Sequence, residues 1–200
     1  MPDTGAPWNI PYVAGTDLVS DWPTDSQTLA EAVADGLDAA GGLVAVKHVL
    51  KTDTWSASVT AGASSAVTDL SITHTLADAA NKLIITAFFG AASTSTNGGQ
   101  VGIAVADDGT LIAIGDAAGT RVRTSAGGRV GGTSDASITF SPSITFVYAP
   151  GDTASHTYTV NAQNINTGTQ TLYVNRSVDD VNAATRARTA SAFVIQEIKV

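Results

Sequence analysis

The feature that most constrains this fold is a short-period apolar pattern that starts at Leu43 and continues to the C-terminus. Short segments rich in β-branched and aromatic residues alternate there with turn residues, and no second helical pattern interrupts them. The expected strands are 43–51, 55–60, 69–75, 82–90, 100–106, 111–114, 137–148, 156–163, 171–175 and 192–200. This series predicts a mainly β fold: a jelly-roll-like β-sandwich, preceded by an extended arm and one short helix.

Alternation within the strands predicts which side chains face the core. Ile144, Phe146 and Tyr148 share one face of their segment, and Tyr158 and Val160 are expected to point inward. The run Asp107-Asp108-Gly109-Thr110 predicts a hairpin, because Asp-Gly readily adopts positive φ angles. Pro142 interrupts a long segment and indicates a bulge or an edge strand.

Residues 24–40 predict a helix, with Thr24 as the N-cap and Gly41-Gly42 as its end. Its apolar stripe is narrow, and a lone helix of this length is marginal in water. The helix therefore needs a partner, either the β-domain or copies of itself. The spacing of the stripe fits a coiled-coil seam, so residues 24–42 are a candidate trimeric coiled coil. The candidate trimer-interface residues are Ala30, Val33, Leu37 and Ala40.

Residues 1–23 predict an extended arm, because four of the six prolines lie there and each disfavours helix before it. The arm is rich in aromatic and apolar side chains, unlike a disordered tail. It either docks on another surface or folds back on its own body. The candidate attachment residues are Trp8, Ile10, Tyr12, Leu18 and Trp22.

Charge is distributed unevenly along the chain. The net charge is −8, and residues 1–46 contain seven acidic residues and no lysine or arginine. This head is either a solubilising segment or an attachment arm beside a neutral body. The absence of cysteine excludes disulfides and thiolate chemistry. No basic patch indicates nucleic-acid binding, no apolar run is long enough to cross a membrane, and residues 1–17 do not resemble a signal peptide.

The sequence predicts no catalytic, cofactor-binding or metal-binding residues. His48, His74 and His156 lie in separate strand-like segments without ligands at zinc spacing, and half-exposed surface histidines are expected. The neighbouring aspartates at 107–108 and 179–180 are interpreted as loop charge. A Ca²⁺ site formed by Asp179, Asp180 and Asn182 is the alternative.

Two regions of the chain, residues 7–40 and the β region, contain short segments in a recognisable order. Residues 7–40 contain W-N-I-P-Y, then D-L-V, then the helical run L-A-E-A-V-A-D-G-L. This segment resembles the N-terminal part of tail-fibre and minor structural proteins of tailed bacteriophages. The β region resembles the C-terminal domain of phage fibres at residues 49–54, 82–85, 114–121, 171–177 and 191–198. The chain lacks a long shaft between helix and β region.

The resemblance implies a homotrimeric virion protein that attaches through residues 1–23 and presents residues 43–200 as a knob. Its partners would be copies of itself, other virion proteins such as capsid, portal or tail, and a host-surface glycan or protein. The alternatives are a capsid decoration or head-fibre protein and, more remotely, a glycan-degrading enzyme. The arginines of the long loops either contact a ligand or pair with loop aspartates: Arg121, Arg123, Arg129, Arg176, Arg186 and Arg188.

Overall fold

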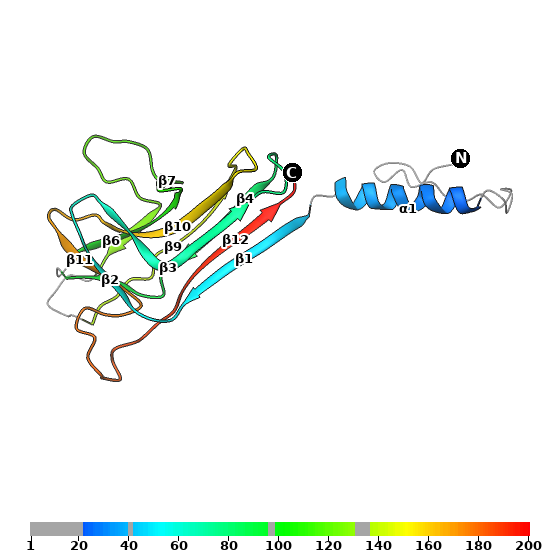
Figure 1. The fold of residues 1–200 in the computed structure, drawn as a ribbon. Coiled ribbons are helices and arrows are strands. Elements are labelled where there is room, and N and C mark those ends of the chain that lie inside the picture. The colour runs from blue at the N-terminus through cyan, green and yellow to red at the C-terminus, as the bar shows by residue number, and fades with distance from the viewer. Residues whose placement is uncertain (1–21, 40–41, 96–98, 131–136) are drawn as a thin grey trace. The chain divides into compact units, whose positions relative to one another are not determined.

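A computed structural model describes residues 22–39, 42–95, 99–130 and 137–200 and shows a mainly β protein (Figure 1). The predicted fold class is confirmed, while the strand connectivity of a jelly roll stays a prediction. The chain divides into two compact units, residues 1–43 with 199–200 and residues 44–198. The first unit contains helix α1 (Trp22–Ala39), and the second contains nearly all of the β structure.

Helix α1 begins at Trp22, two residues before the predicted start, so the assignment of Thr24 as N-cap is wrong. The reason is that proline is tolerated in the first turn of a helix, where its missing N–H would have no partner anyway. Ala30 is exposed and Val33 is 40% exposed. The side chain of Leu37 and all of Ala40 lie outside the described part of the chain.

Twelve strands form three sheets within the described residues. The first sheet has the order β1-β12-β4-β9, and the second has the order β3-β10-β6-β7 with β8 also paired to β6. A smaller sheet has the order β2-β11-β5. The strand bounds are β1 (Leu43–Lys51), β2 (Trp55–Val59), β3 (Ser64–Thr75), β4 (Lys82–Phe88), β5 (Ala92–Thr94), β6 (Gln100–Asp107), β7 (Thr110–Ile112), β8 (Ala126–Arg129), β9 (Ser143–Tyr148), β10 (Ser155–Asn164), β11 (Gln170–Val174) and β12 (Ser191–Ile198).

The core lies between the two larger sheets. Ile85 and Phe193 from the first sheet, and Ile72, Tyr158 and Val160 from the second, are at most 5% exposed and belong to one hydrophobic cluster. The predicted inward orientation of Tyr158 and Val160 is therefore confirmed. Ring contacts also join the sheets, since Tyr148 and Tyr158 lie edge to face with centroids 6.3 Å apart.

The observed strands depart from the predicted ones at the start of β3, which begins at Ser64 rather than 69, at two short strands and around one proline. Strands β5 and β8 were not predicted, because one has three residues and the other is rich in glycine. The predicted strand over residues 137–148 is wrong in its first half, since β9 begins only after Pro142. Phe140 instead forms an isolated bridge with Ala92, and the Pro142 carbonyl accepts a hydrogen bond from the Phe89 N–H.

The β-domain has two distinct ends. Figure 1 shows β1 beginning and β12 ending at one end of the sandwich, close to the loop between β9 and β10. The turns between β2 and β3 and between β10 and β11 lie at the opposite end (Figure 1). Groups at the two ends are therefore separated by the length of the strands.

Candidate functional site

A polar cluster lies where β6 turns into β7 and β10 begins. Asp107 is the last residue of β6, Asp108 occupies the turn, and His156 is the second residue of β10. The β6–β10 register, which pairs Asp107 with Tyr158, brings the aspartates next to His156. Asp108 and Gly109 have φ angles of 45° and 85°, the positive values of a tight hairpin turn, so the predicted hairpin is confirmed.

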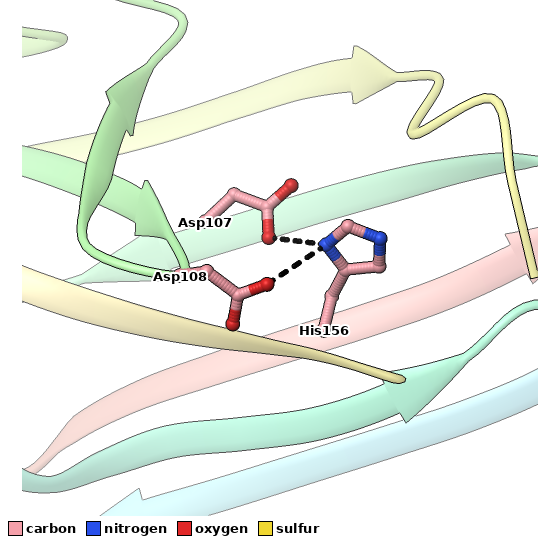
Figure 2. A group of neighbouring side chains, drawn as sticks. All are labelled: Asp107, Asp108 and His156. Carbon is pink, nitrogen blue, oxygen red and sulfur yellow. Dashed lines mark hydrogen bonds and ion pairs between the residues drawn. The ribbon is translucent and has the colours of Figure 1, made fainter. Parts of the chain in front are cut away.

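His156 contacts carboxylates through both ring nitrogens, and Figure 2 shows the two contacts made by one of them. Its Nδ1 lies 2.8 Å from Asp107 Oδ1 and 3.2 Å from Asp108 Oδ2, and its Nε2 lies 3.0 Å from Asp152 Oδ1. The Tyr148 hydroxyl donates to Asp107 Oδ2 at 2.9 Å. We call these five residues the His156 cluster. It joins the two larger sheets, because Tyr148 belongs to the first and the residues on β6 and β10 to the second.

The carboxylates perturb the titration of their neighbours. The hydrogen bond that the His156 ring donates to Asp152 raises the pKa of His156. Asp107 acts in the same direction, and partial burial opposes both. The hydrogen bond from His156 lowers the pKa of Asp152 in turn. Burial, followed by the hydrogen bond to Asp107, raises the pKa of Tyr148 to about 12. The arrangement holds positive charge, either a proton or a cation, between three carboxylates.

A second histidine–carboxylate pair spans the sandwich interior. Glu197 on β12 is 1% exposed and accepts hydrogen bonds from His74, Asn81 and the Ala77 N–H, at 2.8, 2.6 and 2.8 Å. The expectation of half-exposed histidines is wrong for His74, which is 6% exposed, while His48 on β1 is exposed. Sequence reasoning missed both clusters because their members come together only through strand pairing and sheet packing.

Three of the six predicted loop arginines pair with loop aspartates. Arg186 Nε lies 2.9 and 2.8 Å from the two carboxylate oxygens of Asp179. Arg188 and Arg176 lie 2.8 and 3.4 Å from Asp180. The structure therefore shows these three arginines paired with loop aspartates, and their contact with a ligand stays a prediction. The same pairs occupy the two carboxylates of the alternative Ca²⁺ site.

The remaining arginines have other surroundings. Arg123 donates to the Gly115 carbonyl at 2.6 Å, and Arg129 is an exposed residue of β8. Arg121 borders a cleft of about 610 Å³ at the end of the sandwich that carries the β2–β3 and β10–β11 turns. The cleft is lined by Ala61, Gly62, Thr120, Arg121, Val122, Ile165, Asn166 and Thr167.

The predicted attachment residues are mostly outside the described part of the chain. This holds for Trp8, Ile10, Tyr12 and Leu18, and Trp22 is described only as the first residue of α1. Attachment through these side chains therefore stays a prediction.

The first sheet has a largely apolar side that faces away from the core. Val49 and Phe193 mark the inner side of β1 and β12, so the alternate residues point outward. We call this side the outer face. Its most exposed apolar side chains are Val44 (43%), Val46 (48%), Leu50 (62%), Phe88 (38%) and Val147 (60%). The half-buried Ile84, Val194 and Ile198 continue it, and its titratable members are His48 and Lys82.

Comparison with known proteins adds no assignment. No protein-family model matches the chain, and the curated proteins contain no match to it. Among the described residues, no helix has the length and apolar character needed to cross a membrane.

Proposed function

We propose that this chain is a structural protein of a bacteriophage virion that self-associates as a short trimeric fibre or spike. The observation that carries the self-association is the outer face. Five apolar side chains there are each more than a third exposed, on β1, β4 and β9 of one sheet. The half-buried Val194 and Ile198 of β12 lie between β1 and β4. Contiguous exposed apolar surface of this kind typically marks a protein interaction site.

A second copy of the chain is the partner that fits this face best. The outer face contains no acidic residue, so an apolar partner surface matches it better than a basic one. Strand β1 is also the edge of its sheet and leaves one side without a strand among the described residues. Ala30 and Val33 of α1 are uncovered as well, as expected for a helix that associates with copies of itself.

The ends of the β-domain support the proposed orientation in a virion. The chain enters β1 from the helix at one end, and the cleft beside Arg121 lies at the other. An N-terminal arm attached to the particle would thus leave the cleft end free to meet a host surface. The bacteriophage context itself rests on the resemblance of residues 7–40 and of the β segments to phage fibre proteins.

Paired lysine substitutions test whether the outer face mediates assembly. Val46→Lys and Val147→Lys place a charge on the face, whereas Val181→Lys makes the same change at a loop valine that is 50% exposed. Burying three unpaired ammonium groups in an assembly is costly. Light scattering after size-exclusion chromatography should therefore show loss of the assembly in the first two variants and its retention in the third. If all three variants assemble to the same extent, the outer face does not mediate self-association.

Truncation tests the attachment of the arm. A chain starting at Thr24 keeps nearly all of α1 and the whole β-domain, so it should fold and self-associate. When the truncated chain is the only form supplied during particle assembly, purified phage particles should not contain it. Quantitative mass spectrometry of the purified particles measures how much of the truncated chain they carry. Normal incorporation would show that residues 1–23 are not the anchor.

A further inference from the structure

We propose that Asp107, Asp108 and His156 form a binding site for a divalent transition metal ion, with Zn²⁺ as the best-fitting ion. One ligand atom from each residue contributes: Asp107 Oδ1, Asp108 Oδ2 and His156 Nδ1. These atoms all lie within 4.8 Å of one another. Figure 2 shows the two carboxylates approaching the same ring nitrogen from neighbouring directions.

The distances suit ligands that share one ion. Zinc binds nitrogen and oxygen ligands at about 2.0–2.2 Å, so two neighbouring ligand atoms lie roughly 3 Å apart. The observed separations of His156 Nδ1 from the two carboxylate oxygens are 2.8 and 3.2 Å. An ion could therefore replace the shared proton with only small movements of the side chains.

Each candidate ligand is held from outside by a second group. His156 Nε2 faces Asp152, Asp107 Oδ2 accepts from the Tyr148 hydroxyl, and Asp108 Oδ1 accepts from the Thr157 N–H at 2.9 Å. Metal-binding histidines usually donate their other ring N–H to a carboxylate or carbonyl in this way. These outer contacts hold the three side chains in an arrangement whose inner ligand atoms lie within 4.8 Å of one another.

Charge and ligand type select the ion. Three aspartates surround one imidazole, and none of the three forms an ion pair with a lysine or arginine within the described residues. A divalent ion would balance this excess of negative charge. Ca²⁺ and Mg²⁺ prefer sites made of oxygen ligands, whereas an imidazole nitrogen with two carboxylates suits Zn²⁺ and its neighbours in the first transition row.

A second observation points to a polar ligand at this end of the interior. His74 on β3 is the direct cross-strand neighbour of His156, so the two side chains lie on the same side of the sheet. The Nδ1 atom of His74 is buried and has no hydrogen-bond partner in the described structure. Buried polar atoms without partners are rare and often mark an ion or ordered ligand.

The site is independent of the proposed self-association. The three candidate ligands lie on the second sheet and its β6–β7 turn, and Tyr148 reaches them from the inner side of the first sheet. The outer face is the opposite side of that first sheet. Either proposal can fail while the other stands.

Calorimetric titration of the metal-free full-length protein with ZnCl₂ tests the proposal. We expect one ion per chain at the His156 cluster, and no comparable binding of CaCl₂ or MgCl₂. Asp108→Asn should weaken that binding at least about tenfold, as expected for loss of a metal ligand or its support. This variant should fold, because asparagine tolerates the positive φ of the turn and can still accept from the Thr157 N–H. Asp116→Asn, an equal charge change at an exposed loop residue, should bind like the parent.

A spectroscopic measurement separates this site from adventitious binding. Zn²⁺ should shift the ring ¹⁵N resonances of His156, with the largest change at Nδ1, and leave those of exposed His48 unchanged. Shifts confined to His48, unchanged zinc affinity in Asp108→Asn, or no binding at millimolar ZnCl₂ would each overturn the proposal and leave a proton as the only occupant.

Discussion

At the scale of single residues, Glu197 shows how a buried charge is accommodated between the sheets. Burial by itself would raise the pKa of Glu197, but the hydrogen bonds from Asn81, the Ala77 N–H and His74 outweigh it and lower the pKa below its usual 4.5. A lowered carboxyl pKa adds stability that is fully present above the unfolded-state value. This contribution is lost as the pH falls through the folded-state pKa.

Glu197→Gln should therefore change how stability depends on pH. The variant keeps the size of the side chain but cannot ionise, so it lacks this source of acid sensitivity. The difference in free energy of unfolding between parent and variant should be constant from pH 7 to about 5 and should narrow below about 4.5. Urea denaturation of parent and variant at several pH values measures this difference in free energy of unfolding. A difference that stays constant to pH 3 would show that the carboxylate contributes nothing as an ion.

Asn175 is a second residue whose importance is set by distant partners. It is fully buried with a φ of 63°, donates to the Lys51 and Asp53 carbonyls at 2.9 and 3.0 Å, and accepts from Ser191 at 2.6 Å. Asn175→Ala should cost about 3 kcal/mol, because buried backbone groups lose their partners and alanine tolerates positive φ poorly. Thermal denaturation measures this cost. Asn182→Ala, at an exposed loop position, should change stability by less than about 0.5 kcal/mol.

Sequence reasoning could not assign either residue its role. Asn175 and Ser177 match a glycosylation motif, yet in the folded chain the Asn175 side chain is buried and its amide donates to two backbone carbonyls. The partners of Asn175 lie up to 124 residues away, and those of Glu197 up to 123. No local sequence pattern predicts contacts between residues so far apart in the chain. The burial of Tyr158 and Val160, in contrast, is predicted by the alternation of apolar and polar residues alone.

At the scale of secondary-structure elements, close backbone approach fixes how β4 meets the segment before β12. A Cβ atom at Gly90 would overlap the Ala190 carbonyl oxygen and lie 2.8 Å from the Thr189 Cβ. Gly90→Ala should therefore destabilise the protein by about 3 kcal/mol through strain. Gly115→Ala is the control, because no atom lies within 4 Å of its added Cβ. Chemical denaturation should separate the two variants, and equal stabilities would contradict the packing described here.

The elements themselves could be predicted from the sequence more completely than the sites. Strand β1 has the predicted bounds, and the β6–β7 hairpin follows from Asp108-Gly109. Strand β3 begins at Ser64 rather than 69, since it continues past the positive φ of Asp69, where β10 also shifts register. The His156 cluster depends on the register between β6 and β10, and hydrophobic alternation does not specify which strands pair.

At the scale of the whole molecule, the proposed self-association requires that each copy of the chain exposes a surface that other copies can cover. The outer face and the exposed residues of α1 are surfaces that a single copy exposes and that the proposed assembly would bury. Because that interface is apolar, added salt should not weaken it, unlike an interface held by exposed ion pairs. Assembly that falls apart on raising NaCl from 0.05 to about 0.5 M would indicate a different interface.

Sedimentation equilibrium of the unmodified 200-residue chain measures directly whether copies of it associate. The account predicts a species of three times the 20.2 kDa chain mass at micromolar concentration, with no dependence of that mass on NaCl. A mass equal to one chain throughout the micromolar range would contradict self-association through the outer face and α1.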